Sequence, residues 1–361
     1  MLIRSAGLAI RSWILPLILL CTAFASHAVE VKGLYEVAVK VEDQSALERT
    51  KGTRAGLAQV LVKVSGRSDV VNHSAVKDAL NRADSYRLQH SYDHQPATLT
   101  APEYLNLKLR YDETQIRRLL RRAQLPIWPS NRPEILFWMV TDLPNEGRLH
   151  VSRELMPEAY ELLERKMAER AAPLRLPLLD LEDQLNLSAR DAWDQNAERA
   201  TEAAQRYDTD HWTVLSFYRT NSGEYRASIQ VEAGVHSDRE ALIAGSLEDL
   251  IDKAVDWSVD RVSQGYTFVP KQNAEEVALR LESVDNYKEY QAVISHFEGL
   301  EMVRSVRLVA ANGNVLDLSM AIDGSPAKLR DLLRRDPKLA EITDLTTDEM
   351  SLFFRWRPVT R

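Results

Sequence analysis

Cysteine is almost missing from this 361-residue chain, which has a single one, Cys21, inside an apolar run near the N-terminus. One cysteine cannot form a disulfide within the chain, and no other thiolate is present to bind zinc or attack a substrate. The fold therefore rests on burial of apolar side chains, and a chain of this length can build two or three hydrophobic cores.

Motifs that carry chemistry are missing as well. No glycine-rich phosphate loop is present, because the nearest segment, Ser65-Gly66-Arg67, lacks both a second glycine and a lysine. No serine has the Gly-x-Ser-x-Gly context of a nucleophile elbow. His90 and His94 lie on a predicted strand, where a separation of four residues is roughly 13 Å, too far for one metal ion. From its motifs we expect no catalytic residue, no metal site and no cofactor.

An excess of basic residues is also lacking, since the formal net charge is −7. This balance argues against general nucleic-acid binding, which needs a concentrated basic surface. Arginines do gather on two predicted amphipathic helices: Arg117, Arg118, Arg121 and Arg122 on one, Arg330, Arg334 and Arg335 on the other. We interpret both groups as solvated helix faces, with contact to an anionic envelope surface as the alternative.

What the N-terminus does have is the pattern of a secretory signal peptide. Arg4 and Arg11 both precede an apolar run over residues 13–25, which is shorter than the roughly 20 residues of a membrane span. Small residues end the run and predict cleavage between Ala28 and Val29. We therefore expect residues 1–28 to be a signal peptide and the mature chain to be periplasmic, without a transmembrane segment.

Two alternatives to cleavage remain open at this point. The apolar run could stay as an uncleaved N-terminal anchor, although Pro16 would kink a spanning helix. Cys21 could be lipidated, although Leu20 is a poor residue to precede a lipid-modified cysteine.

The rest of the chain divides into three regions, for which we predict three small mixed domains of α/β and α+β class. Residues 29–128 form an α+β unit, with alternating strands over 34–41, 86–92 and 104–111 and a helix that begins after Ser45 and ends at Gly66. Residues 125–133 contain three prolines and are typical of an extended linker or boundary.

The second predicted domain, residues 129–270, is a layered α/β sheet with helices on its faces. Residues 135–141 are almost continuously apolar, as in a strand covered on both sides. Further strands are predicted over 174–179, 212–218 and 225–232, and a helix over 246–262. The third domain, residues 271–361, has the order β-α-β-β-α-β of a ferredoxin-like sandwich, with a hairpin signal at Asn312-Gly313.

Several segments resemble an exported gammaproteobacterial family catalogued only as a domain of unknown function. They are LYEV (34–37), DQS (43–45), QVLVKVSG (59–66), LPIW (125–128), NRP (131–133) and LPLLDLEDQ (176–184). The resemblance covers roughly residues 33–265, implies an uncharacterised periplasmic protein and supplies no catalytic residue. The second domain is also similar, at fold level, to the amino-terminal domain of TolB and to outer-membrane activators of penicillin-binding proteins, but a fold does not fix a function.

Two places are candidates for a binding surface. Asp180, Glu182 and Asp183 follow a predicted strand, where α/β sheets bind ligands. Three carboxylates could hold Mg²⁺ or Ca²⁺ there, but we favour a capping role, with Asp180 at a helix N-terminus. Trp193 stands in a polar segment, where an exposed ring would suit a partner or a glycan and a buried one would pack on its own helix.

Three functions follow from these observations. The leading hypothesis is a non-enzymatic adaptor, assembly or regulatory factor that binds an envelope protein, through an exposed sheet edge or the helix around Trp193. A cell-wall hydrolase with Asp180 and Asp183 as acid and base is the first alternative. A periplasmic binder of a small ligand is the second. The partner and the oligomeric state are left open.

Overall fold

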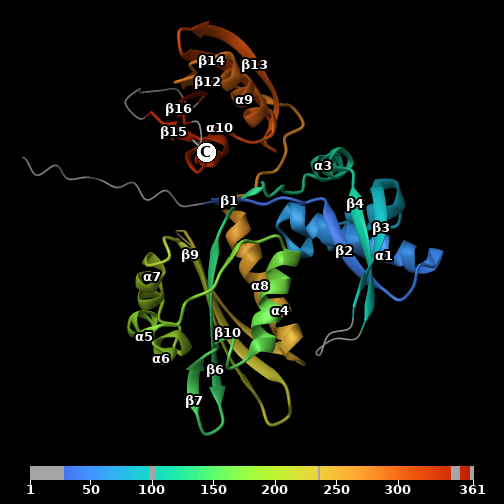
Figure 1. The fold of residues 1–361 in the computed structure, drawn as a ribbon, viewed down its shortest axis with the longest axis vertical. Coiled ribbons are helices and arrows are strands. Elements are labelled where there is room, and N and C mark those ends of the chain that lie inside the picture. The colour runs from blue at the N-terminus through green and yellow to red at the C-terminus, as the bar shows by residue number, and fades with distance from the viewer. Residues whose placement is uncertain (1–27, 97–102, 235, 343–349, 358–361) are drawn as a thin grey trace, which may run out of the picture.

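The computed structural model describes residues 28–96, 103–234, 236–342 and 350–357, and it contains three principal sheets (Figure 1). The sheets lie in successive parts of the chain, within residues 36–111, 135–244 and 275–356. The predicted fold class, several small mixed α/β units, is confirmed. No helix of the described residues is long and apolar enough to cross a membrane.

The first sheet is antiparallel, in the order β2 (Glu36–Val41), β4 (Tyr104–Tyr111), β3 (Arg87–Gln95). Helix α1 (Ala46–Ser65) covers one face, and the alternating leucines of β4 point into that contact. The helix lies very close to the sheet, because a Cβ on Gly56 would come within 2.7 Å of Leu109. The helix begins at the Ser45 cap and ends at Gly66, whose φ of 73° is the left-handed conformation that favours glycine.

The middle sheet has the order β11-β10-β9-β6-β7, with β8 (Leu174–Arg175) also paired to β6. Its central strand β6 (Ile135–Leu143) is buried on both faces, as its apolar run predicts. The other strands are β7 (Gly147–His150), β9 (His211–Arg219), β10 (Tyr225–Ala233) and β11 (His236–Ala244). The strand predicted over 174–179 is wrong beyond Arg175, because Pro177 follows and Leu179 takes a φ of 54°.

Two different sets of helices cover the faces of the middle sheet. Helices α4 (Pro157–Glu169) and α8 (Leu247–Gln264) pack together against one face, toward α1 (Figure 1). Three short helices cover part of the other: α5 (Leu181–Asn186), α6 (Ala189–Trp193) and α7 (Ala197–Gln205). The buried apolar cluster beneath the short helices involves β6 and β9, and over β10 the contacts are polar, through Gln195.

The third sheet has the order β13-β14-β12-β16-β15 and contains the predicted elements together with one strand more. Its elements are β12 (Glu275–Glu282), α9 (Tyr287–Glu298), β13 (Val303–Asn312), β14 (Val315–Ile322), α10 (Pro326–Arg334), β15 (Leu339–Glu341) and β16 (Ser351–Trp356). The added edge strand β15 reverses the chain before its last strand. Therefore β16 runs parallel to β12, whereas a direct return from α10 would make the two antiparallel.

The proline-rich segment lies between the three sheets and is densely packed. Arg132 is fully buried, and its guanidinium donates to the carbonyl oxygens of Lys63, Arg170, Ala171, Trp128 and Pro129. It also lies over the Trp128 ring, at 4.0 Å. Because the Lys63 and Arg170 carbonyls belong to the C-terminal ends of α1 and α4, one cation holds two helices that pack on different sheets.

The first arginine cluster lies on helix α3 (Glu113–Arg122) and is only partly solvated. Arg117 donates to the carbonyl of Glu301, and Arg121 forms an ion pair of 2.6 Å with the buried Asp323. The interpretation of this helix as a solvated face is therefore wrong for these two residues, although Arg118 and Arg122 are exposed. A backbone carbonyl and a carboxylate near the third sheet supply these contacts.

Candidate functional site

Three leucines beside the middle sheet are almost fully exposed to solvent. Leu178 precedes α5, and Leu181 and Leu185 are one turn apart on it, with exposed fractions of 69%, 74% and 72%. Leucine is normally among the most buried residues, and three exposed ones within eight positions, two of them on one face of a helix, are more than the isolated exceptions usual at a surface. We call Leu178, Leu181 and Leu185 the leucine surface.

The backbone beneath the leucine surface is held by a buried carboxylate. Asp183 is 4% exposed and accepts hydrogen bonds from the Leu179 amide at 2.8 Å and from the Tyr207 hydroxyl. Tyr207 in turn accepts from the Leu178 amide. Leu179 has a positive φ, which costs a leucine roughly 1–2 kcal/mol. Such strain persists where surrounding contacts impose it, and it is common at binding sites.

The acidic cluster predicted from the sequence is assembled at this helix, around one arginine. Asp180 caps α5 by accepting from the Asp183 amide, as the capping interpretation predicts. Arg206 forms ion pairs with Asp180 at 2.6 Å, with Asp183 at 2.7 Å and with Glu182 at 3.5 Å. The Arg206 hydrogen bonds and the helix amides hold the pKa of Asp180 below its usual value. Asp180 therefore stays ionised, and its contacts with Arg206 help to orient the helix.

Trp193 lies at the end of α6 and is partly buried against its own unit. The Arg148 guanidinium lies over its ring at 4.9 Å, and the Tyr218 ring is 6.3 Å away. Trp193 and Leu179 both pack against the same buried cluster of the middle sheet. Trp193 is thus less available to a partner than the leucines.

The leucine surface is the feature that sequence reasoning missed. The residues belong to a segment that reads as a strand followed by a helix, in which apolar side chains are expected to be buried. One sequence signal could have revealed it: Leu181 and Leu185 lie on the same face of a helix of only six residues. No predicted element is available to pack against that face.

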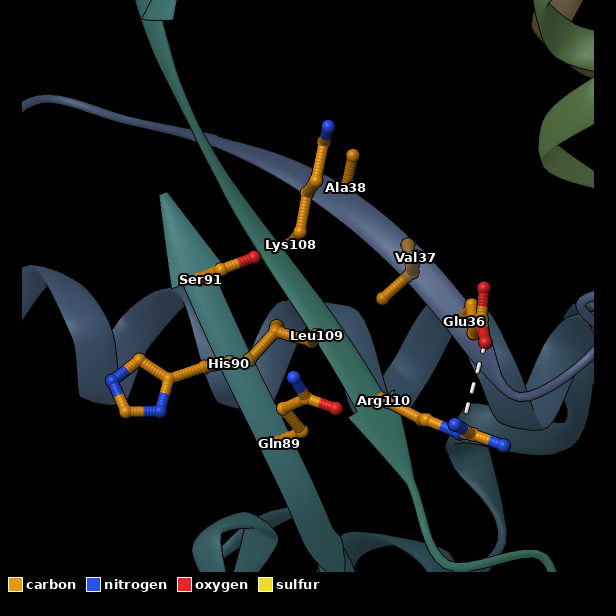
Figure 2. A pocket seen from close by; sticks show the side chains of 9 residues that line it. All are labelled: Glu36, Val37, Ala38, Gln89, His90, Ser91, Lys108, Leu109 and Arg110. Carbon is orange, nitrogen blue, oxygen red and sulfur yellow. Dashed lines mark ion pairs between the residues drawn. The ribbon is translucent and has the colours of Figure 1, made fainter. Parts of the chain in front are cut away.

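A hollow lies on the outer face of the first sheet, opposite α1 (Figure 2). It has a volume of about 450 Å³ and is lined by side chains from β2, β3 and β4, including Glu36, Ser91, Lys108 and Arg110. Figure 2 shows Arg110 directed at Glu36, with an ion pair of 3.7 Å between them. His90 lines this hollow, whereas the His94 side chain lies 3.6 Å from the Glu103 carboxylate. The hollow is open and its charges are largely paired, so it lacks the convergent groups of an enclosed ligand site.

Two further sequence predictions concern the cleavage position and metal binding. Ala28 and Val29, the expected cleavage position, lie in β1 (Ala28–Glu30), which pairs with β5 (Asn131–Pro133), while residues 1–27 fall outside the described part of the chain. Within that part, no group of three or more His, Cys, Asp or Glu side chains is arranged to hold a metal ion.

Part of the chain matches the model of a known protein family. Residues 28–129 match the model of a family described as a domain of unknown function (DUF8605). This agrees, for that part of the chain, with the expected resemblance to an uncharacterised family. The match covers the first sheet and α1 and ends before the middle sheet and the leucine surface. A comparison with curated proteins finds no match.

Proposed function

We propose that the protein is exported to the bacterial periplasm and acts there as a non-enzymatic adaptor, assembly or regulatory factor that binds an envelope protein. The observation that carries this proposal is the leucine surface. Exposed apolar patches on a rigid support are typical of protein interfaces, where a few buried side chains supply most of the binding free energy. The N-terminal sequence pattern supports export. The fold-level similarity to the amino-terminal domain of TolB and to outer-membrane activators of penicillin-binding proteins, which the sequence predicts, favours the envelope as the setting.

The partner would bury the three leucines in an apolar groove. Fully burying one leucine contributes roughly 1.5–3 kcal/mol, so three of them can supply much of the binding free energy of a micromolar complex, about 8 kcal/mol. The support of α5 by Asp183 and Arg206 lowers the cost of ordering the segment on binding. These contacts make the leucine surface ready to bind without rearrangement.

The hydrolase hypothesis has less support from the same residues. A general acid needs a raised carboxyl pKa, which burial away from cations provides. Asp180 instead faces the Arg206 guanidinium, and Asp183 accepts from the same group. The ion pair favours the charged form of Asp180, and Arg206 occupies oxygen atoms of both carboxylates that would act on a substrate.

The test is affinity capture of the tagged full-length chain from cells that export it with its own leader. Leu181→Ser with Leu185→Ser should lose an envelope protein that the unchanged chain captures. Leu47→Ser with Leu88→Ser is the matched control, since these leucines are 64% and 63% exposed on the first unit. Equal capture by both double variants, or a tagged chain found in the cytoplasm, would contradict the proposal.

A further inference from the structure

Strand β11 differs from the other edge strands of the described residues. Sheet edges expose unpaired N–H and C=O groups, and proteins usually protect them with short strands, bulges or proline. Strands β2, β7 and β15 are short, with at most six residues, and β3 and β13 contain register shifts. Strand β11 has nine residues without proline and pairs with β10 without a shift. It is a long, regular edge.

Two contacts identify which backbone groups of β11 point away from the sheet. The Ala241 amide donates to the side chain of its neighbour Glu240, and Lys253 of α8 donates to the Ile243 carbonyl. Backbone groups alternate in direction along an antiparallel strand, so those of Ser237 and Arg239 point outward as well. Within the described residues, the outward N–H and C=O of Arg239 bond to no other group.

The side chains of β11 indicate which residues a strand added to this edge would carry. Asp238 and Glu240 are on the α8 side, where Asp238 lies 3.6 Å from Arg261. Ala241 and Ile243 are on the other side, and Ile243 is 55% exposed. Arg239 is on that side too, but its guanidinium donates to the Gln195 carbonyl and to the Gln230 side chain. An added strand would therefore present basic side chains to Asp238 and Glu240 and apolar ones to Ala241 and Ile243.

A second copy of the chain fits this edge poorly. Two β11 strands paired antiparallel over their full length would be centred on Glu240, which would face its own copy. A register centred on Arg239 would place the two arginines opposite each other and Asp238 opposite Glu240. Like charges directly opposite destabilise a sheet. A register centred on Ala241 avoids them, but it sets Arg239 against Ile243 and Glu240 against Leu242, so no charge gains a partner of opposite sign. A different chain is therefore the better occupant.

We propose that β11 accepts an extended segment of a partner protein, with alternating basic and apolar residues, as an added strand of the middle sheet. Main-chain hydrogen bonds would provide affinity, and the alternation would provide specificity. The Glu240 and Lys253 side chains hold two of the outward groups until the segment replaces them. This site is separate from the leucine surface, and its test does not depend on that surface.

The test uses the full mature chain and synthetic twelve-residue peptides in which valine alternates with lysine or with glutamate. The lysine peptide should slow hydrogen exchange at the amides of Ser237, Arg239 and Ala241, which a contact through side chains alone would leave unprotected. Ala241→Pro removes an outward N–H without touching a bond to β10, and should weaken binding by about tenfold or more. Glu240→Lys should weaken the lysine peptide and favour the glutamate peptide.

Absence of protection at these amides with the lysine peptide would overturn the proposal, as would unchanged affinity in a folded Ala241→Pro variant. If that variant does not fold, the Glu240→Lys exchange of preference decides in its place. Loss of partner capture in the leucine variants, with peptide binding retained, would separate this site from the proposed function.

Discussion

Replacing Arg132 by methionine should destabilise the whole protein, although Arg132 belongs to neither proposed binding surface. The substitution keeps an apolar stem of similar length and removes the guanidinium. Five carbonyl oxygens then lose their donor, among them those of Lys63 and Arg170 at the C-terminal ends of two helices. In those positions the carbonyl groups have no neighbour within the helix to replace it.

The magnitude follows from two opposing contributions. Hydrogen bonds to a charged group contribute about 1.5–3 kcal/mol each, so five of them set an upper limit on the order of 10 kcal/mol. Burial of the charge opposes this by several kcal/mol, and it lowers the pKa of Arg132 to about 9, which leaves the group protonated at neutral pH. We expect a net loss of about 3–5 kcal/mol in the free energy of unfolding.

Urea denaturation followed by tryptophan fluorescence measures this loss. Trp128, which lies beneath the Arg132 guanidinium, reports on the surroundings of the substituted residue. Arg199→Met is the control, because Arg199 is exposed and pairs only with Glu202 on the same helix, so its loss should stay within about 0.5 kcal/mol. A loss under about 1 kcal/mol for Arg132→Met would refute the view that one cation joins the helices.

Three further changes test other parts of the structure. Burial lowers the pKa of Lys63 to about 8, below its unfolded value of 10.5, so the unfolded state binds more protons between these values. The free energy of unfolding should therefore rise from pH 8 to 10.5, and in pH-dependent denaturation Lys63→Met should remove the part of this rise between pH 8 and 9, below the pKa of Arg132. Gly66→Ala should lower the free energy of unfolding by about 2–4 kcal/mol, because φ is 73° and the new Cβ would lie 2.8 Å from the Ser263 Cβ. Adding Ser263→Gly should restore part of this loss in the same assay, whereas a loss below about 1 kcal/mol for Gly66→Ala would count against the close contact. Asp183→Asn should lower the melting temperature by several degrees in calorimetry and speed amide exchange at Leu179, whereas an unchanged exchange rate there would show that the carboxylate does not hold the segment.

Local patterns were sufficient for most of the fold. The alternation of β4 predicts its limits, 104–111, as the structure has them, and the apolar run of β6 predicts a strand buried on both faces. The caps Ser45 and Ser246 mark the starts of the two long helices, α1 and α8. These elements could be predicted because each signal lies within a few residues of the feature it specifies.

Features that depend on distant residues could not be predicted in the same way. Strand β11 carries a charged, exposed sequence without apolar alternation, and it is a strand only because β10 pairs with it. Arg132 and Arg121 look like solvated surface residues until the segments that bury Arg132 and pair Arg121 with Asp323 are in place. The leucine surface is the opposite case, since its side chains look like core residues and nothing in the described chain covers them.

The most direct test of the central claim is photo-cross-linking in living cells, with a photoreactive residue placed at position 181 or 185 of the exported chain and, as control, at position 47. Mass spectrometry of the products should identify one envelope protein that cross-links from the first two positions and not from the third. The same products from all three positions, or none from 181 and 185 in a folded periplasmic chain, would contradict the claim that the leucine surface binds a partner.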